Sequence, residues 1–170
     1  MQALAREMNL SETTFIFPRD PATETREGKK VRIFTVETEL TFTIVPFCNP
    51  QTLSDLKFSY IQAADFLKKS GANFFYFLCP ERREGRLETR ARMFFYGGED
   101  PATGSAAGCA ASWMVQHGVA NNDEQVVIRQ GVECRRPSQM HVSAKRVGQR
   151  VNDVRVGGYA VEILRETVVL

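Results

Sequence analysis

The sequence is short of the features that most often identify a protein's chemistry. Its 170 residues include only two histidines and four cysteines, without a C-x-x-C pair or a histidine close enough in sequence to complete a zinc site. It contains no P-loop, dinucleotide-binding glycine pattern, H-E-x-x-H or G-x-S-x-G motif. Metal chemistry and cysteine–histidine catalysis are therefore poorly supported.

Long hydrophobic runs and an excess of one charge are also absent. No stretch approaches the run of roughly 18 apolar residues that a membrane helix needs, and Arg6 and Glu7 interrupt the segment where an export signal would need an apolar core. The net charge of +2 gives no general attraction to nucleic acid. We expect a soluble globular protein with no nucleic-acid or membrane partner. The scattered cysteines, expected to be small buried hydrophobes, fit a reducing cytoplasm.

Three segments have the pattern of helices. Residues 1–8 repeat apolar side chains at helical spacing, and residues 51–70 are expected to form one helix that ends at Gly71. Residues 104–117 are small or apolar nearly all round, which is typical of a helix buried on every side. Gly118 is expected to end this helix, with His117 in its last turn.

Short strands with turn signals between them account for most of the remaining chain, and residues 20–30 are expected to form a hairpin loop. The expected strands are residues 13–17, 31–36, 40–47, 73–78, 86–95, 125–129, 140–145, 154–156 and 159–164. They do not alternate regularly with helices, so a doubly wound parallel sheet is not expected. The sequence predicts an α+β fold of short strands with one buried helix.

Residues 86–95 show the clearest period of two. Leu87 and every second residue to Phe95 are expected to face the core. The alternate positions, which include Arg86, Arg90 and Arg92, are expected to face solvent. Three arginines on one strand face can also bind an anion, but we favour the solvated face. The glutamates interspersed among the neighbouring arginines argue against a nucleic-acid footprint.

The most unusual segment is residues 97–108, where a strand ends in glycines, two carboxylates follow, and a small-residue loop leads into the buried helix. The free N–H groups at such a helix start favour an anion. Gly104 allows close approach and Ser105 adds a hydroxyl donor, while partial burial of Asp100 would suit proton transfer. The alternative is a structural cap, with Asp or Thr as N-cap and Pro101 in the first turn. Residue types alone favour neither the anion site nor the cap. Glu12 is a second carboxylate, and its own sequence context indicates a turn residue.

Several blocks of the sequence resemble the phenazine-biosynthesis PhzF-like isomerase family. The most diagnostic is EDPATGSAAG at residues 99–108. The other similar blocks are residues 1–15, 32–35 with 39–40, 129–133 with 136–138, and 154–158. Together they cover nearly the whole chain.

This resemblance implies a diaminopimelate-epimerase-like fold, in which two lobes, each a curled sheet around a central helix, enclose a cleft. It implies catalysis without a cofactor, by proton transfer on a small carboxylate-bearing metabolite such as a dihydro-hydroxyanthranilate. Glu12 and Asp100 would be the opposed proton-transferring carboxylates, whose environments split their pKa values. Gly104 and Ser105 would hold the substrate.

The sequence departs from the family pattern after Leu40, where the family's Gly-His-Pro segment is missing. We therefore interpret residues 1–40 as the remnant of a first lobe and residues 41–170 as a second lobe with its central helix at about 104–117. The remnant can pack on the second lobe, exchange between the chains of a homodimer or stay mobile. The alternative function is a non-catalytic module that binds a small anion or a protein.

Overall fold

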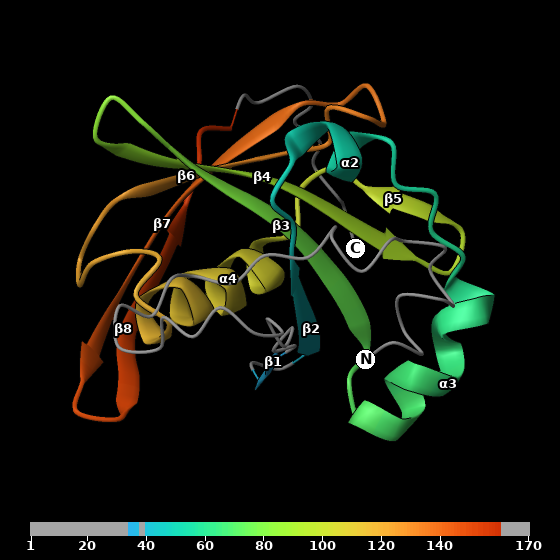
Figure 1. The fold of residues 1–170 in the computed structure, drawn as a ribbon, viewed down its shortest axis with the longest axis horizontal. Coiled ribbons are helices and arrows are strands. Elements are labelled where there is room, and N and C mark those ends of the chain that lie inside the picture. The colour runs from blue at the N-terminus through green and yellow to red at the C-terminus, as the bar shows by residue number, and fades with distance from the viewer. Residues whose placement is uncertain (1–33, 38–39, 161–170) are drawn as a thin grey trace, which may run out of the picture.

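The small and apolar segment that follows Thr103 forms the helix at the centre of the molecule. The computed structural model describes residues 34–37 and 40–160, in which this helix, α4 (Gly104–Gln116), lies in the hollow of a curled sheet (Figure 1). His117 caps its C-terminus, and Gly118 follows with a positive φ of 68°. The buried helix and its end are therefore confirmed.

In the described residues the sheet has eight strands, and it is mixed. In chain order the strands are β1 (Phe34–Glu37), β2 (Thr41–Pro46), β3 (Phe74–Arg83), β4 (Arg86–Phe95), β5 (Gly98–Asp100), β6 (Val126–Gln130), β7 (Ser138–Val147) and β8 (Arg150–Gly157). Their spatial order is β1-β2-β3-β4-β6-β7-β8, and β5 pairs with β4 off this path. The β2–β3 and β4–β6 pairs are parallel and the others are antiparallel. A curled mixed sheet around a central helix is the predicted fold class.

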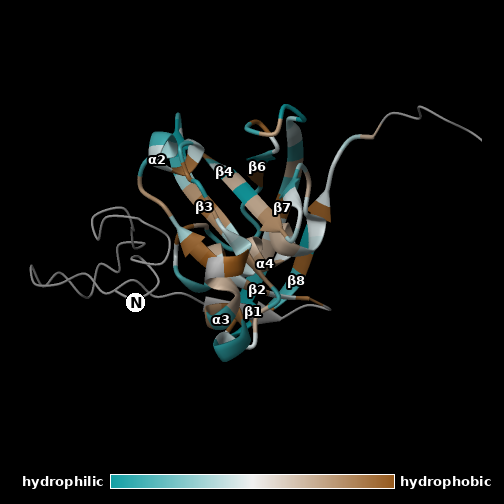
Figure 2. Ribbon diagram, turned by 90° about the vertical axis from the view of Figure 1, so that its right-hand side faces the viewer, coloured by the Kyte–Doolittle hydropathy of each residue, from teal (hydrophilic) through white to brown (hydrophobic). Residues whose placement is uncertain are grey.

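The main core lies between α4 and the concave face of the sheet. Small side chains of α4 allow close approach, and Trp113 and Met114 fill the space toward the strands. Figure 2 shows α4 mostly in pale and brown colours, enclosed by strands. At the β8 end of the described strand order, Val154 and Val156 lie against Gly108.

A second core covers the opposite face of β2 and β3. Alternate residues of β3 point to opposite sides, so Tyr76 and Leu78 join the α4 core while Phe75 and Phe77 join this second cluster. Helices α2 (Pro50–Ser54) and α3 (Tyr60–Ser70) supply its cover. This double burial explains why residues 74–79 are apolar without interruption.

The single helix expected over residues 51–70 was wrong, because the segment forms two helices. Asn49 caps α2, which ends at Asp55, and the chain is not helical again until Tyr60. Between them Phe58 turns into the second core, with its ring centroid 5.2 Å from that of Phe77. Arg92 also binds backbone carbonyls at this break, as described below. Gly71, with a φ of 71°, follows α3 as expected.

Most of the other strand expectations in the described residues are confirmed, with changed bounds. β3, β7 and β8 are longer than predicted because β3 continues into an antiparallel hairpin with β4, and β7 into one with β8. Tyr159 and Ala160 lie beyond β8 outside any strand. The helix at 1–8, the strand at 13–17, the loop at 20–30 and the rest of 159–164 fall outside the described residues.

Strand β4 differs from its prediction at one position on each face, Phe95 and Arg92. Leu87, Thr89, Ala91 and Met93 are buried as expected, but Phe95 is 40% exposed. On the other face Arg86 is exposed, whereas Arg92 is only 7% exposed. Arg92 is buried because α2 and β5 bring acceptors to it from both sides.

The cysteines also differ from the uniform burial that was expected. Cys79 and Cys109 are buried, Cys134 is partly buried and Cys48 is exposed. Cys48 lies just after β2, where the chain has left the core. Within residues 34–37 and 40–160, no helix is both long enough and apolar enough to span a membrane.

Candidate active site

Asp100 stands where the edge strand β5 ends and the chain turns toward α4. Its Oδ2 accepts a hydrogen bond of 2.7 Å from the Thr103 hydroxyl, and its Oδ1 accepts a longer one of 3.4 Å from the Ala102 N–H. Asp100 is partly buried. The Asp100 carboxylate thus binds groups two and three residues later in the turn, and Oδ1 makes the longer of its two hydrogen bonds.

The capping interpretation is correct in only one respect. Thr103 is the N-cap residue of α4, but its hydroxyl is directed to Asp100 rather than to the helix. Pro101 lies in the turn ahead of Thr103, so the expectation that it opens the first helical turn was wrong. The side chains of this turn therefore order Asp100 instead of capping α4.

Gly104 and Ser105 form the exposed start of α4. The first N–H groups of a helix have no partner within the helix, and the helix dipole places partial positive charge there. This exposed start comes four residues after Asp100. A carboxylate and an anion-attracting helix end are therefore close neighbours in the described residues.

A buried amide supports this turn from behind. Gln130, at the end of β6, is fully buried and donates from Nε2 to the Asp100 carbonyl at 2.7 Å and to the Thr103 hydroxyl at 2.9 Å. Its Oε1 accepts from the Tyr76 hydroxyl at 2.9 Å and from the Thr103 N–H at 3.4 Å. Burial, with the nearby Asp100 charge adding to it, raises the pKa of Tyr76 well above its usual value. Tyr76 therefore stays protonated and acts as a donor.

The segment after β6 holds the backbone of the same turn. Gly131 has a φ of 80°, and a Cβ there would lie 2.8 Å from the Pro101 carbonyl oxygen. Ser138 donates to that carbonyl at 2.5 Å. The backbone around Pro101 is thus held between Gly131 and Ser138, which explains why a glycine is needed at position 131.

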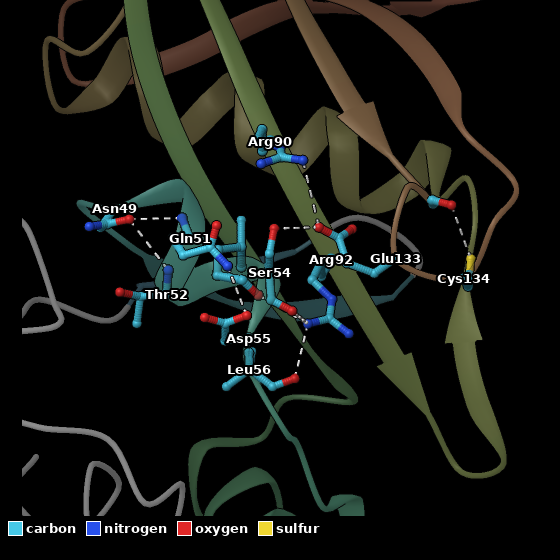
Figure 3. Close-up of polar contacts among 12 residues, drawn as sticks. Asn49, Gln51, Thr52, Ser54, Asp55, Leu56, Arg90, Arg92, Glu133 and Cys134 are labelled. Carbon is cyan, nitrogen blue, oxygen red and sulfur yellow. Dashed lines mark hydrogen bonds and ion pairs between the residues drawn. The ribbon is translucent and has the colours of Figure 1, made fainter.

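Arg92 anchors the residue beside Asp100. Its guanidinium binds both carboxylate oxygens of Glu99, at 2.9 and 2.8 Å, in a pair that is almost fully buried. Its Nη1 also donates to the carbonyls of Leu53, Ser54 and Leu56 at 2.9 to 3.0 Å. Figure 3 shows the guanidinium directed at the end of α2. Arg92 therefore links α2 to the β4–β5 hairpin that carries Asp100.

Two further arginines of this surface are paired with carboxylates of the chain. Arg90 lies 3.9 Å from Glu133, which also accepts from Ser54 at 2.8 Å (Figure 3), and Arg129 lies 3.2 Å from Glu88. These groups line or adjoin a hollow of about 410 Å³ over β3 and β4. Its mixture of charges is what a salt-bridged outer face contains.

A second hollow, of about 300 Å³, lies beside the aromatic residues at the end of β4 and the start of α3. Neither hollow has Asp100 in its lining. In the part of the chain that the structure describes, no three His, Cys, Asp or Glu side chains come together as a metal site would require. Among the described residues, Asp100, Gly104 and Ser105 therefore lie outside both of these hollows, at the start of α4.

The structure brings together some of the predicted site residues. Asp100, Gly104 and Ser105 lie at one strand-to-helix junction, whereas Glu12 falls outside the described residues. Sequence reasoning missed Gln130, Tyr76 and Arg92. Gln130 lies within a block that carries the family resemblance, which was a usable signal. Nothing local marks Tyr76 or Arg92, because each looks like an ordinary strand residue.

Comparison with known proteins agrees with this geometry. The family model described as phenazine biosynthesis-like protein, PhzC-PhzF, matches residues 1–44 and 41–166. Trans-2,3-dihydro-3-hydroxyanthranilate isomerase of Pseudomonas aeruginosa is 47% identical over 72 residues, which are 41% of this chain and 26% of that protein. The chain thus spans about a quarter of that relative's length in the matched region.

Two solved structures share the fold. One, described as a predicted epimerase from Pseudomonas aeruginosa, has a TM-score of 0.67 and 28% identity, covering 92% of this chain and 47% of the other. The other, a PhzF-family phenazine biosynthesis protein from Bacillus anthracis, has a TM-score of 0.56 and 18% identity, covering 66% and 40%. In both comparisons this chain corresponds to less than half of the solved protein.

Proposed function

The chain belongs to the PhzC-PhzF family of phenazine biosynthesis-like proteins, and from this premise we propose that it takes part in a cofactor-independent isomerisation. The substrate would be a small metabolite that bears a carboxylate, of the dihydro-hydroxyanthranilate type named for the P. aeruginosa relative. Asp100 would be one proton-transferring carboxylate and Glu12 the other. Gly104 and Ser105 would bind the substrate carboxylate. A small metabolite as substrate fits the cytoplasmic location that the cysteines favour.

The observation that carries this proposal is the arrangement of Asp100 beside the exposed start of α4. Within the described residues, Thr103 donates to Oδ2 of Asp100, and Oδ1 accepts a long hydrogen bond from a backbone N–H. A substrate carboxylate bound at Gly104 and Ser105 would lie against the positive end of the helix dipole. Its carbon skeleton could then reach Oδ1.

The reaction needs only proton transfers. A carboxylate takes a proton from a carbon next to the π system, so that a C–H bond breaks, an O–H bond forms and the electron pair enters the π system. The proton returns at another carbon of the same system, and the double bond moves. General acid–base groups in position contribute about 10²- to 10⁴-fold to such a step.

Deuterium incorporation tests the proposal. Trans-2,3-dihydro-3-hydroxyanthranilate is incubated with the full chain in D₂O, and product and exchange are followed by NMR. Asp100→Asn and Glu12→Gln should each lower the exchange rate by about 10²-fold or more, and Ser105→Ala should mainly raise KM. Asp123→Asn is the matched control, because Asp123 is exposed and pairs loosely with Lys145 at 3.8 Å. Unchanged exchange in Asp100→Asn would refute the assignment.

A homodimer would let one chain supply Glu12 and its partner supply Asp100. This arrangement predicts that an inactive Glu12→Gln chain mixed with an inactive Asp100→Asn chain recovers part of the activity. Light scattering of the same mixture should give twice the mass of the 19.2 kDa chain. A monomeric mass, or no recovery on mixing, would exclude the shared site.

A second function is favoured by the lack of the family's Gly-His-Pro segment after Leu40. In this alternative the described lobe binds a small anion or a protein without catalysis. Calorimetric titration with the same hydroxyanthranilate then gives binding that Ser105→Ala weakens, while deuterium exchange stays at the level of buffer.

A further inference from the structure

We infer that Gln130 is a positioning residue for Asp100, which it orients both directly and through Thr103. The inference rests on the role proposed for Asp100 as a proton-transferring group. It is carried by the directions of four hydrogen bonds and by the burial of the side chains that make them. It is also carried by the two hydrogen bonds of one amide, which binds the Asp100 main-chain carbonyl and the Thr103 hydroxyl that donates to the Asp100 carboxylate.

The hydrogen bonds leave one orientation for the Gln130 amide. Its Nε2 lies 2.7 Å from the Asp100 carbonyl, which can only accept. A flipped amide would place Oε1 against that carbonyl, two acceptors facing each other. Nε2 therefore supplies both of its hydrogens, one to the Asp100 carbonyl and one to the Thr103 hydroxyl oxygen at 2.9 Å.

This orientation decides where the Thr103 hydroxyl proton goes. Because the hydroxyl oxygen accepts from Gln130, its own hydrogen is available for Oδ2 of Asp100, which lies 2.7 Å away. Upstream, Tyr76 donates to Oε1 of Gln130 at 2.9 Å. Tyr76 donates to Gln130, Gln130 to Thr103, and Thr103 to the Asp100 carboxylate. Successive hydrogen bonds in such a chain polarise and strengthen one another.

Burial makes this arrangement rigid. Gln130 and Tyr76 are 0% exposed and Thr103 is 7% exposed. Breaking one of these bonds would leave a buried polar group unsatisfied, which is more costly than the bond itself is favourable. The amide also holds the main-chain carbonyl of the residue whose carboxylate Thr103 fixes. Gln130 thus constrains Asp100 directly at its main-chain carbonyl and, through Thr103, at Oδ2, so Oδ1 would be the oxygen left for a substrate.

The test compares matched variants of the full chain. Gln130→Met keeps the length of the side chain and removes its polar atoms. Thr103→Val removes the hydroxyl that links Gln130 to Asp100, whereas Thr103→Ser keeps it. Gln139→Met is the control, because Gln139 is exposed on the neighbouring strand β7.

The first readout does not depend on activity. NMR order parameters of the backbone at residues 100–103 should fall in Gln130→Met from about 0.85, the value of a rigid backbone, to below about 0.6. Those of β3 should stay unchanged, which excludes general unfolding. Gln139→Met should leave both regions as they are. If residues 100–103 stay rigid in Gln130→Met, the inference is wrong.

The second readout is the deuterium exchange assay. Gln130→Met and Thr103→Val should lower kcat about 10- to 100-fold, with KM within about twofold, because misplacement of a catalytic group by 1 Å can cost about 10²-fold. Thr103→Ser should retain most of the rate. Equal losses in Thr103→Ser and Thr103→Val, or a rise in KM alone, would overturn the inference. If the unmodified chain exchanges no deuterium, the proposed function fails, and the order parameters alone decide the role of Gln130.

Discussion

Replacing Arg92 with methionine should destabilise the protein by about 3–5 kcal/mol, although the position looks like an exposed strand residue in the sequence. Methionine keeps most of the apolar length of the side chain but removes the guanidinium. The change therefore tests the polar contacts of Arg92 rather than its packing volume.

The expected magnitude comes from what the guanidinium satisfies. Arg92 and Glu99 have side chains that are 8% and 10% exposed, so in Arg92→Met a buried carboxylate loses its counter-charge. Removing one partner of a buried pair costs about 3–5 kcal/mol, because the remaining charge is uncompensated. The carbonyls of Leu53, Ser54 and Leu56 lose a donor as well. We expect these carbonyls to regain solvent as α2 loosens, so they add little to the total.

Urea unfolding followed by circular dichroism measures the effect, with the slope of the transition checked for two-state behaviour. The control is Arg83→Met, since Arg83 pairs with Glu81 at 2.9 Å but its side chain is 69% exposed, and such pairs contribute about 1 kcal/mol or less. The double variant Arg92→Met, Glu99→Gln should recover part of the loss, because it no longer buries an unpaired charge. A loss below about 1 kcal/mol in Arg92→Met would refute the reasoning.

Three further predictions concern separate sites. Gly131→Ala should lower the free energy of unfolding by about 2 kcal/mol or more, because of its positive φ and the backbone contact of the added Cβ; an unchanged urea midpoint would contradict this. The hydrogen bond from Arg82 lowers the pKa of Glu124, so its stabilising effect is present above the unfolded pKa of about 4.3 and is lost as the pH falls through the lower folded pKa. Glu124→Gln should therefore flatten the acid side of the stability profile, and an unaltered slope would contradict it. Burial, with a smaller effect of nearby negative groups, raises the pKa of Cys79 to about 12, whereas Cys48 is exposed. Iodoacetamide should modify Cys48 in the native protein and Cys79 only after unfolding, as mass spectrometry would show.

Local patterns predicted the parts of the fold that depend on neighbouring residues. The run of small residues after Thr103 indicated a buried helix, and Gly71 and Gly118 marked helix ends where a positive φ is needed. The same patterns failed for residues 51–70. The break there depends on Phe58, which packs against Phe77 of β3, a strand further along the sequence.

The candidate site also has a part that the sequence predicted and a part that stays a prediction. The order of residues 99–105 placed Asp100, Gly104 and Ser105 at a strand-to-helix junction, because a strand end and a helix start are both visible in the sequence. The division into lobes at residues 40 and 41, and the role of Glu12, stay predictions.

The amino-acid order alone was enough to predict the buried helix, most of the strands around it and the turn that carries Asp100, since each depends on the period and size of adjacent side chains. Only the tertiary structure decided which polar groups meet. Tyr76 and Gln130 are 54 residues apart, and Arg92 binds carbonyls up to 39 residues away. The physical reason is that periodicity determines which face a side chain takes, whereas the curl and register of the sheet determine what lies opposite that face.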